Sequence, residues 1–311
     1  MNPPIPNPVF TGGTGRSGTT IVGRLLGQHP EIALTRPAEL RFITDSDGLL
    51  DAIASQRHHP PLILARAGAA ASRRMARIRR TEPRDPTAPA DLFAALFERR
   101  WFPRIAEANP NLTPTIGTRA ARDFAAAFRS DRQRAARRLM QTIVDPMART
   151  EGRRRWVDTT PPNASRADEI LDLYPQARII NVIRDGRRVA YSMTRRTWAP
   201  DRVIDALDVW QTSMLAAAQA IDRAPTNTVM TVQLEDLVVR ARLDTYRRIL
   251  SFAELEDDPA TRQWFEENVA LERSRPDLWE RCLSPAEIRQ LNEHYDQVID
   301  ELTAAGVRVP T

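Results

Sequence analysis

A glycine-rich loop between an apolar strand and an apolar helix constrains the fold of this chain more than any other feature. Residues 8–13 read Pro-Val-Phe-Thr-Gly-Gly, residues 14–20 read Thr-Gly-Arg-Ser-Gly-Thr-Thr, and residues 21–26 carry the apolar positions of a helix. A loop of this composition directs several backbone N–H groups toward one point at the positive end of a helix dipole. The segment therefore predicts a phosphate site at the end of a strand in an α/β fold.

The spacing of the loop glycines is that of a nucleoside-triphosphate loop, but the lysine of that motif is missing. The G-x-x-x-x-G pattern begins at Gly13, and Thr19 stands where a lysine should follow Gly18. Since that lysine reaches the β- and γ-phosphates of ATP, Thr19 cannot supply its charge. The cation inside the loop is Arg16, which favours an anion whose charged end lies nearer the crown of the loop. A strand-to-helix turn without a ligand is the alternative for this segment considered alone.

A second motif combines an arginine and a serine after a predicted buried strand. Residues 178–183 form a nearly continuous apolar run rich in Ile and Val, which is typical of a parallel strand. Arg184 stands at the carboxyl end of this strand, and Ser192 lies two turns into the helix that follows. An arginine fork and a hydroxyl suit a phosphate dianion. Considered alone, Arg184 would instead pair with a nearby carboxylate.

Together the two motifs resemble those of sulfotransferases that use 3′-phosphoadenosine 5′-phosphosulfate (PAPS). In that family a Lys or Arg precedes Ser-Gly-Thr-Thr, as Arg16 does here, and an Arg and a Ser eight residues apart bind the 3′-phosphate. Weaker likenesses follow in the family's order at residues 25–30, 232–237 and 279–288. The resemblance covers most of the chain and is nearer the bacterial and tyrosylprotein branch than the cytosolic aryl branch. It implies PAPS as the cofactor, held by Gly15, Arg16, Ser17, Gly18, Thr19, Thr20, Arg184 and Ser192.

The same resemblance points to the catalytic residues. Sulfuryl transfer is an in-line displacement that depends on positioning and charge neutralisation, and it needs a base for the acceptor hydroxyl. The tyrosylprotein branch carries Glu-x-Arg after the first helix, and Glu39 and Arg41 stand in that register. We expect Glu39 to be the base and Arg41 to orient it or to contact the acceptor. His29 is the alternative base, because aryl sulfotransferases use histidine, and a solvated loop carboxylate is the alternative role for Glu39.

The chain departs from the family at one charged position. Residues 156–163 resemble the family's W-x-E-K-T-P-x-N, but Thr159 replaces the lysine, and the whole chain contains no lysine. That lysine would neutralise the leaving group. We therefore expect Arg16 to carry more of this catalytic role, with the helix N-terminus assisting, and Thr159 and Thr160 to donate hydrogen bonds only.

Composition excludes several other classes of protein. All 45 basic residues are arginine and 40 residues are acidic, which gives a net charge of +5. Because the arginines are scattered and aromatic residues make up only 6%, no nucleic-acid partner is expected. The single cysteine, Cys282, suits a reducing cytoplasm. No signal pattern and no apolar run of about 18 residues occur, so the sequence predicts a soluble cytoplasmic protein of bacterial type without a membrane span.

The order of predicted elements indicates a single sulfotransferase domain over residues 1–311. Its α/β core is a P-loop-like parallel sheet flanked by helices, with strands near Trp156, at 178–183 and at 228–232. Residues 45–150 are expected to form a mainly helical insertion on the acceptor side, with Arg73 to Pro89 as an exposed linker or a mobile loop. Residues 91–102 are expected to pack as a helix through Leu92, Leu96, Phe97 and Trp101. Ser284 and Glu287 form a capping box that opens a helix ending near Gly306.

The predicted function is transfer of a sulfuryl group from PAPS to a hydroxyl of a small metabolite, glycan or lipid. No metal ion is expected at the site. Two alternatives remain open at this level: a kinase-like phosphotransferase with a P-loop, and a non-catalytic nucleotide-binding protein of the same fold. The glycine spacing favours the kinase and the missing lysine opposes it, while the Arg184–Ser192 pair and Glu39 oppose the non-catalytic alternative.

Overall fold

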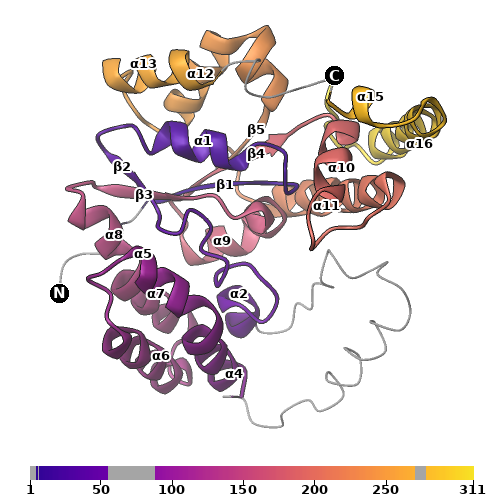
Figure 1. Cartoon of the computed structure of the whole chain (residues 1–311). Coiled ribbons are helices and arrows are strands. Elements are labelled where there is room, and N and C mark those ends of the chain that lie inside the picture. Colours follow the sequence, from indigo (N-terminus) through magenta and orange to yellow (C-terminus); the bar gives the residue numbers. More distant parts are fainter. Residues whose placement is uncertain (1–4, 6, 55–87, 270–277) are drawn as a thin grey trace.

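Five parallel strands form the central sheet (Figure 1). The computed structural model describes residue 5 and residues 7–54, 88–269 and 278–311. The strand order is β2-β3-β1-β4-β5, with the bounds β1 Val9–Gly13, β2 Ile32–Leu34, β3 Arg155–Asp158, β4 Arg178–Ile183 and β5 Val229–Gln233. β1 lies at the centre and pairs along its whole length with β4. The expectation of an α/β fold with a parallel sheet is therefore confirmed.

Helices cover both faces of the sheet, and the alternation of side chains along the strands separates two apolar cores. Val9 of β1 joins the core under α1 (Thr19–Leu26), α12 (Arg242–Phe252) and α13 (Pro259–Asn268). The next residue, Phe10, faces the opposite core, where its ring lies 5.2 Å from that of Trp156. Successive side chains of a strand point to opposite faces, so β1 contributes to both cores. Figure 1 shows α1, α12 and α13 on one side of the sheet and α9 (Ala167–Leu173) on the other.

Residues 45–150 are helical over most of what the structure describes. Their elements are α2 Leu49–Ile53, α4 Ala88–Leu96, the π-helical turn η1 Phe97–Trp101, α5 Phe102–Ala108, α6 Pro114–Phe128, α7 Arg132–Ile143 and α8 Asp145–Thr150. An aromatic cluster holds these helices together, with Phe93 and Phe124 at 4.9 Å and Phe42 and Phe97 at 5.2 Å between ring centroids. The cluster is continuous with the core that contains Phe10 and Trp156, so this region packs directly on the sheet.

A third core lies beyond the end of β4. It is enclosed by α10 (Gly186–Thr194), α11 (Val203–Arg223), α15 (Leu278–Cys282) and α16 (Pro285–Ala304) around Trp210 and Tyr295. The predicted capping box is present, since Ser284 and Glu287 exchange hydrogen bonds at the start of α16. Two short elements complete the fold, a 3₁₀ turn η2 Pro161–Arg166 and a π-helical turn η3 Asp236–Arg240. Among the described residues, no helix has the length and apolarity to cross a membrane.

Some sequence expectations are corrected by the structure. Leu92 does not pack, because α4 buries Phe93 and leaves Leu92 52% exposed. The expected linker from Arg73 to Pro89 lies outside the described residues up to residue 87, and its last two residues belong to α4. Pro89 is compatible with the first turn of a helix, because backbone N–H groups in that turn make no hydrogen bond within the helix. The strand β2 was not expected, because it has only three residues.

Gly12 offers a test of how closely η2 approaches β1. A Cβ atom at Gly12 would lie 2.2 Å from the backbone N of Ala164. The Gly12→Ala variant should therefore lose about 3 kcal/mol or more of unfolding free energy in urea titrations, because neither backbone can move freely. Gly152→Ala is the control, since its Cβ would meet nothing within 4 Å and only its φ of 70° is unfavourable. That control should cost about 1 kcal/mol, and equal losses in the two variants would contradict the close approach.

Candidate active site

The glycine-rich loop connects the carboxyl end of β1 to the N-terminus of α1. Three of its residues have positive φ, Gly13 at 146°, Arg16 at 78° and Gly18 at 108°, and these values turn the chain back over the strand end. At Gly18 a side chain would also meet Leu234, only 2.8 Å from the Cβ position. Among the described residues no side chain caps the N-terminus of α1, and the first turn of this helix contains no acidic residue. The positive end of the helix is therefore open to an anion.

Two buried hydroxyl groups of the loop have no hydrogen-bond partner in the part of the chain that the structure describes. They are Oγ1 of Thr14 and Oγ of Ser17. Both side chains are buried, at 4% and 0% exposure. Since buried hydroxyls are normally hydrogen-bonded, these two are suited to donate to a bound oxyanion.

The structure brings the loop and the second motif together. Arg16 Nε donates to Ser192 Oγ at 3.0 Å, and Arg184 Nη1 donates to the carbonyl oxygen of Arg16 at 3.2 Å. Glu235 faces both Arg184, at 4.0 Å, and Arg188, at 3.5 Å. Cations therefore outnumber carboxylates here, and burial lowers the pKa of Arg184 and of Arg16 without removing charges that arginine retains at neutral pH. The arrangement suits a ligand with more than one negative charge.

Glu39 and Arg41 lie on the segment that follows β2. Arg41 Nε is 3.5 Å from Glu39 Oε2 and 3.9 Å from Asp45 Oδ1. The side chain of Glu39 is 38% exposed, and its charge is close enough to Arg16 to oppose the lowering of that guanidinium's pKa. A partly exposed carboxylate near the crown of the loop can accept a proton from a bound hydroxyl.

Two residues of β3 and its turn hold the segment that carries Glu39. Leu40 N donates to Asp158 Oδ1 at 2.6 Å, and Thr159 donates to the carbonyl oxygen of Ala38 from its N at 2.8 Å and its Oγ1 at 2.9 Å. Glu39 is thus tethered through the residues on either side of it. Both hydrogen bonds of Thr159 go to the carbonyl oxygen of Ala38 and not to the place of a leaving group. Its methyl group fills the space beside Gly23, where an added Cβ would lie 2.1 Å from the methyl carbon.

Asp158 is the buried centre of this tether. Its carboxylate also accepts from Thr160 and from Asn163 Nδ2, at 2.7 Å, and Asn163 donates at 3.1 Å to the carbonyl oxygen of Thr11 in β1. Burial raises the pKa of Asp158 to about 6, against the opposing effect of the hydrogen bonds from Asn163, Leu40 and Thr160. Asp158 therefore couples β1 and β3 to the segment of Glu39, a role that sequence motifs did not indicate.

His29 lies beyond the C-terminal end of α1, at the opposite end of the helix from the loop. Glu31 N donates to Nδ1 of His29 at 3.2 Å, which leaves Nε2 to donate to the carbonyl oxygen of Glu256 at 3.1 Å. The ring is buried at 1% exposure. Both ring nitrogens of His29 thus have partners within the protein, and the ring lies at the far end of α1 from the loop.

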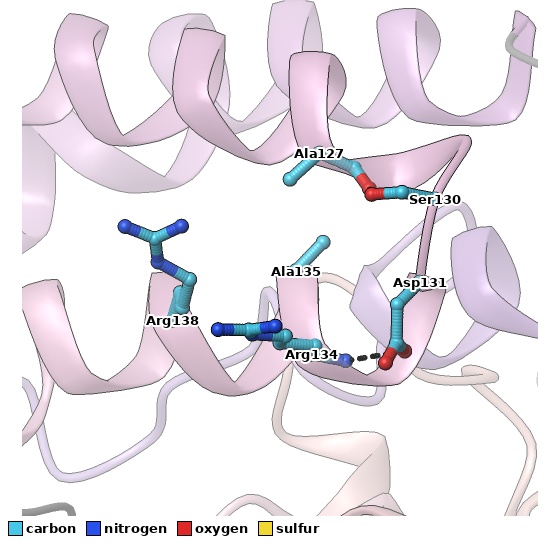
Figure 2. Close-up of a pocket in the computed structure, with 6 residues that line it drawn as sticks. All are labelled: Ala127, Ser130, Asp131, Arg134, Ala135 and Arg138. Atoms are coloured by element: carbon cyan, nitrogen blue, oxygen red, sulfur yellow. Dashed lines mark hydrogen bonds between the residues drawn. The ribbon is translucent and has the colours of Figure 1, made fainter.

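A small hollow of about 200 Å³ lies elsewhere, between α6 and α7 (Figure 2). Asp131 closes one side of it and accepts from Arg134 N at 2.9 Å as the cap of α7. Its lining is Ala127, Ser130, Asp131, Arg134, Ala135 and Arg138. None of the residues expected at the site lies in this hollow.

Comparison with known proteins identifies the family to which this fold and loop belong. The sulfotransferase family model matches residues 8–259, which include the glycine-rich loop, the motif after β4 and the segment of Glu39. The chain therefore belongs to the sulfotransferase family. No curated protein matches it in sequence.

Solved structures share the fold at low sequence identity. The sulfotransferase domain of the Synechococcus PCC 7002 olefin synthase is 18% identical, with a TM-score of 0.51 and coverage of 100% of this chain and 99% of that domain. The sulfotransferase domain from the curacin biosynthetic pathway is 15% identical, with a TM-score of 0.52 and coverage of 98% and 99%. Both comparisons extend the likeness of fold to nearly the whole chain.

The buried Asp158 carboxyl predicts a pH dependence of stability. Because its folded pKa of about 6 lies above the ordinary aspartate value of 3.8, the folded state binds the proton more tightly than the unfolded state. Its contribution to the free energy of unfolding is therefore present at low pH and is lost as pH rises from about 4 to about 6, by up to about 3 kcal/mol. The stability difference between wild type and Asp158→Asn should shrink over this range in urea titrations.

The control for this experiment is Asp123→Asn, whose carboxylate lies in an exposed pair with Arg119. Its stability difference from wild type should stay nearly constant between the two pH values. A difference for Asp158→Asn that grows as pH rises would mean that hydrogen bonding, not burial, dominates the pKa of Asp158.

Proposed function

We propose that the protein transfers the sulfuryl group of PAPS to a hydroxyl of a small metabolite, glycan or lipid. The main support is that the glycine-rich loop after β1 and the turn after β4 lie side by side. Arg16 of the loop donates a hydrogen bond to Ser192 of the second motif. PAPS carries charge at both its 5′ and 3′ positions and so complements two such turns. ATP carries its phosphates at one end only, and the loop lacks the lysine that ATP requires.

In this proposal each motif holds one end of the cofactor. The backbone N–H groups of the loop over residues 15–20 and the hydroxyls of Thr14 and Ser17 bind the 5′-phosphosulfate. Arg184 and Ser192 bind the 3′-phosphate, with Arg184 positioned by Glu235. The free and exposed Cys282 fits a reducing compartment, and we place the enzyme in a bacterial cytoplasm.

The chemistry follows from the position of Glu39 beside the loop. Glu39 accepts the proton of the acceptor hydroxyl, the hydroxyl oxygen forms a bond to sulfur, and the bond between sulfur and the bridging oxygen breaks. The electron pair and the negative charge pass to the 5′-phosphate of the product, 3′-phosphoadenosine 5′-phosphate (PAP). Arg16 and the N-terminus of α1 stabilise this charge, while Arg41 orients Glu39 at 3.5 Å or contacts the acceptor.

Nucleotide binding distinguishes this function from the alternatives. PAP should raise the melting temperature, since a ligand at about 100 times its Kd adds about 2.7 kcal/mol of stability. ATP and adenosine 5′-phosphosulfate, which lack the 3′-phosphate, should have little effect at the same concentration. Equal shifts from all three nucleotides would contradict a sulfotransferase site and favour the phosphotransferase alternative.

Removal of Arg184 tests the placement of the 3′-phosphate. The Arg184→Ala variant should weaken PAP binding by roughly 2–4 kcal/mol, or about 30- to 700-fold in Kd by calorimetry. Arg178→Ala is a matched control, because Arg178 begins the same strand and pairs with Glu254 at the other end of β4. The control should leave Kd within about twofold, and undiminished affinity in Arg184→Ala would refute the placement.

Removal of the charge at Glu39 tests the base. The Glu39→Gln variant keeps the side-chain shape and should bind PAP normally, but its kcat should fall by roughly 10²–10⁴. His29→Gln provides the comparison and should keep its kcat, because both nitrogens of His29 serve structural contacts. Near-wild-type kcat in Glu39→Gln would exclude Glu39 as the base. The acceptor for these assays comes from a screen of hydroxyl compounds, and sulfation of tyrosine peptides in that screen would overturn the expected class of acceptor.

A further inference from the structure

A partly buried carboxylate, Asp45, lies between two arginines from separate parts of the chain. Its Oδ1 is 3.9 Å from Nε of Arg41, which belongs to the segment of Glu39, and its Oδ2 is 3.6 Å from Nη2 of Arg100. The side chain of Asp45 is 14% exposed, against 46% for Arg41 and 54% for Arg100. Burial raises the pKa of Asp45, while both arginines and the indole of Trp101 act in the opposite direction. Each carboxylate oxygen of Asp45 thus faces a different guanidinium.

The backbone fixes Asp45 in this position. Asp45 N donates to the carbonyl oxygen of Arg41 at 2.9 Å, and Gly48 N donates to the carbonyl oxygen of Asp45 at 2.9 Å. The first of these bonds closes one helical turn, in which residues four apart lie on the same face. Arg41 and Asp45 are therefore neighbours because of the local fold of the segment, and their approach does not depend on the ion pair alone.

Arg100 reaches Asp45 from the helical region. It belongs to η1, the π-helical turn Phe97–Trp101, and such turns are rare and occur frequently at functional sites. The ring of Phe97 lies 5.2 Å from that of Phe42, so η1 packs directly on the segment of Glu39. Asp45 is thus held by Arg100 on one side and presents its other oxygen to Arg41.

Arg41 is shared between two carboxylates. Its Nε is 3.5 Å from Oε2 of Glu39 and 3.9 Å from Oδ1 of Asp45, whereas a close hydrogen bond from a guanidinium to a carboxylate measures about 2.7–2.9 Å. Arg41 is therefore bonded closely to neither. A guanidinium that closed on Glu39 would occupy a lone pair of the carboxylate and favour its ionised form, which makes it a weaker proton acceptor.

We infer that Asp45 is a positioning residue of the reaction: held by Arg100, it draws Arg41 away from Glu39 and leaves that carboxylate free to accept the proton of the acceptor hydroxyl. This inference rests on the proposed function, in which Glu39 is the base. Asp45 acts through Arg41 and takes no part in the proton or sulfuryl transfer.

The first measurement needs neither cofactor nor acceptor. Crystal structures of the full chain at pH 7 compare the distance from Arg41 Nε to Glu39 Oε2 in the wild type and in Asp45→Asn. Because the amide carries no charge to attract Arg41, this distance should shorten from 3.5 Å to about 2.8 Å. Asp45→Ser removes the same charge with a smaller polar group and should shorten the distance in the same way. An unchanged distance overturns the inference.

Asp47→Asn is the matched control for this comparison. Asp47 is exposed and lies two residues beyond Asp45, and its φ of 62° is one that asparagine adopts readily. The control removes one carboxylate charge from the same segment without touching the pair. The distance from Arg41 to Glu39 should therefore stay at the wild-type value, and shortening in the control as well would overturn the inference.

Kinetics then test whether this arrangement matters for turnover, with PAPS and the acceptor found in the screen of hydroxyl compounds. Asp45→Asn should lower kcat roughly tenfold, a part of the roughly 10²–10⁴ that a general base contributes, and should leave the Kd of PAP within about twofold. Asp45→Glu keeps the charge and should recover most of kcat. In an Arg41→Gln background, Asp45→Asn should lower kcat no further, because no guanidinium remains to close on Glu39.

The outcomes separate this inference from the proposed function. If the wild type does not bind PAP, the proposed function fails, and the inference fails with it. If PAP binds and Glu39→Gln loses activity while Asp45→Asn keeps its kcat, the inference alone fails. An equal fall of kcat on removal of Asp45 in the presence and absence of Arg41 also overturns it, because Asp45 would then support only the fold of the segment.

Discussion

The parallel pairing of β1 with β4 determines where the charged groups of the candidate site lie. The two strands are in register from Val9↔Arg178 to Gly13↔Val182, so both end at the same edge of the sheet. In parallel sheets ligands bind at this carboxyl edge. The glycine-rich loop and the turn after β4 consequently begin side by side, and the hydrogen bonds from Arg16 to Ser192 and from Arg184 to Arg16 join them. A shift of one residue in this register would move Arg184 away from the loop.

The buried carboxylate of Asp158 also helps to position the site, on the side of β1 that pairs with β3. It connects β3 to the segment of Glu39 through Leu40 and, by way of Asn163, to the carbonyl oxygen of Thr11. Thr159 adds two hydrogen bonds to Ala38. Because Glu39 itself is partly exposed and makes only a 3.5 Å ion pair, its position depends on these backbone contacts. Where the family resemblance led us to expect a lysine, Thr159 supports the segment of Glu39 and adds no charge.

The sequence predicted the parts of the fold and site that depend on local pattern. Three predictions are confirmed: the strand at residues 178–183, the capping box at Ser284 and the sulfotransferase family. Each of them depends on residues that are close together in the sequence. The contacts of Asp158 with Leu40 and of Thr159 with Ala38 join residues far apart in the chain, and no motif indicates them. The prediction for Leu92 was wrong because α4 has more apolar residues than its buried face can hold. Periodicity alone could not show that Leu92 is the apolar residue left exposed. The roles of Glu39, Arg41 and Arg16 stay predictions.

The crystal structure of the complex with PAP tests the central claim most directly, since it shows which motif holds which phosphate. We predict that the 5′-phosphate accepts hydrogen bonds of about 2.9 Å from backbone N–H groups of the loop, while the 3′-phosphate contacts Arg184 and Ser192. Glu39 should then face the side of the 5′-phosphate from which a hydroxyl would attack. A nucleotide bound in the opposite direction, or with its 3′-phosphate in solvent away from Arg184, would contradict the account.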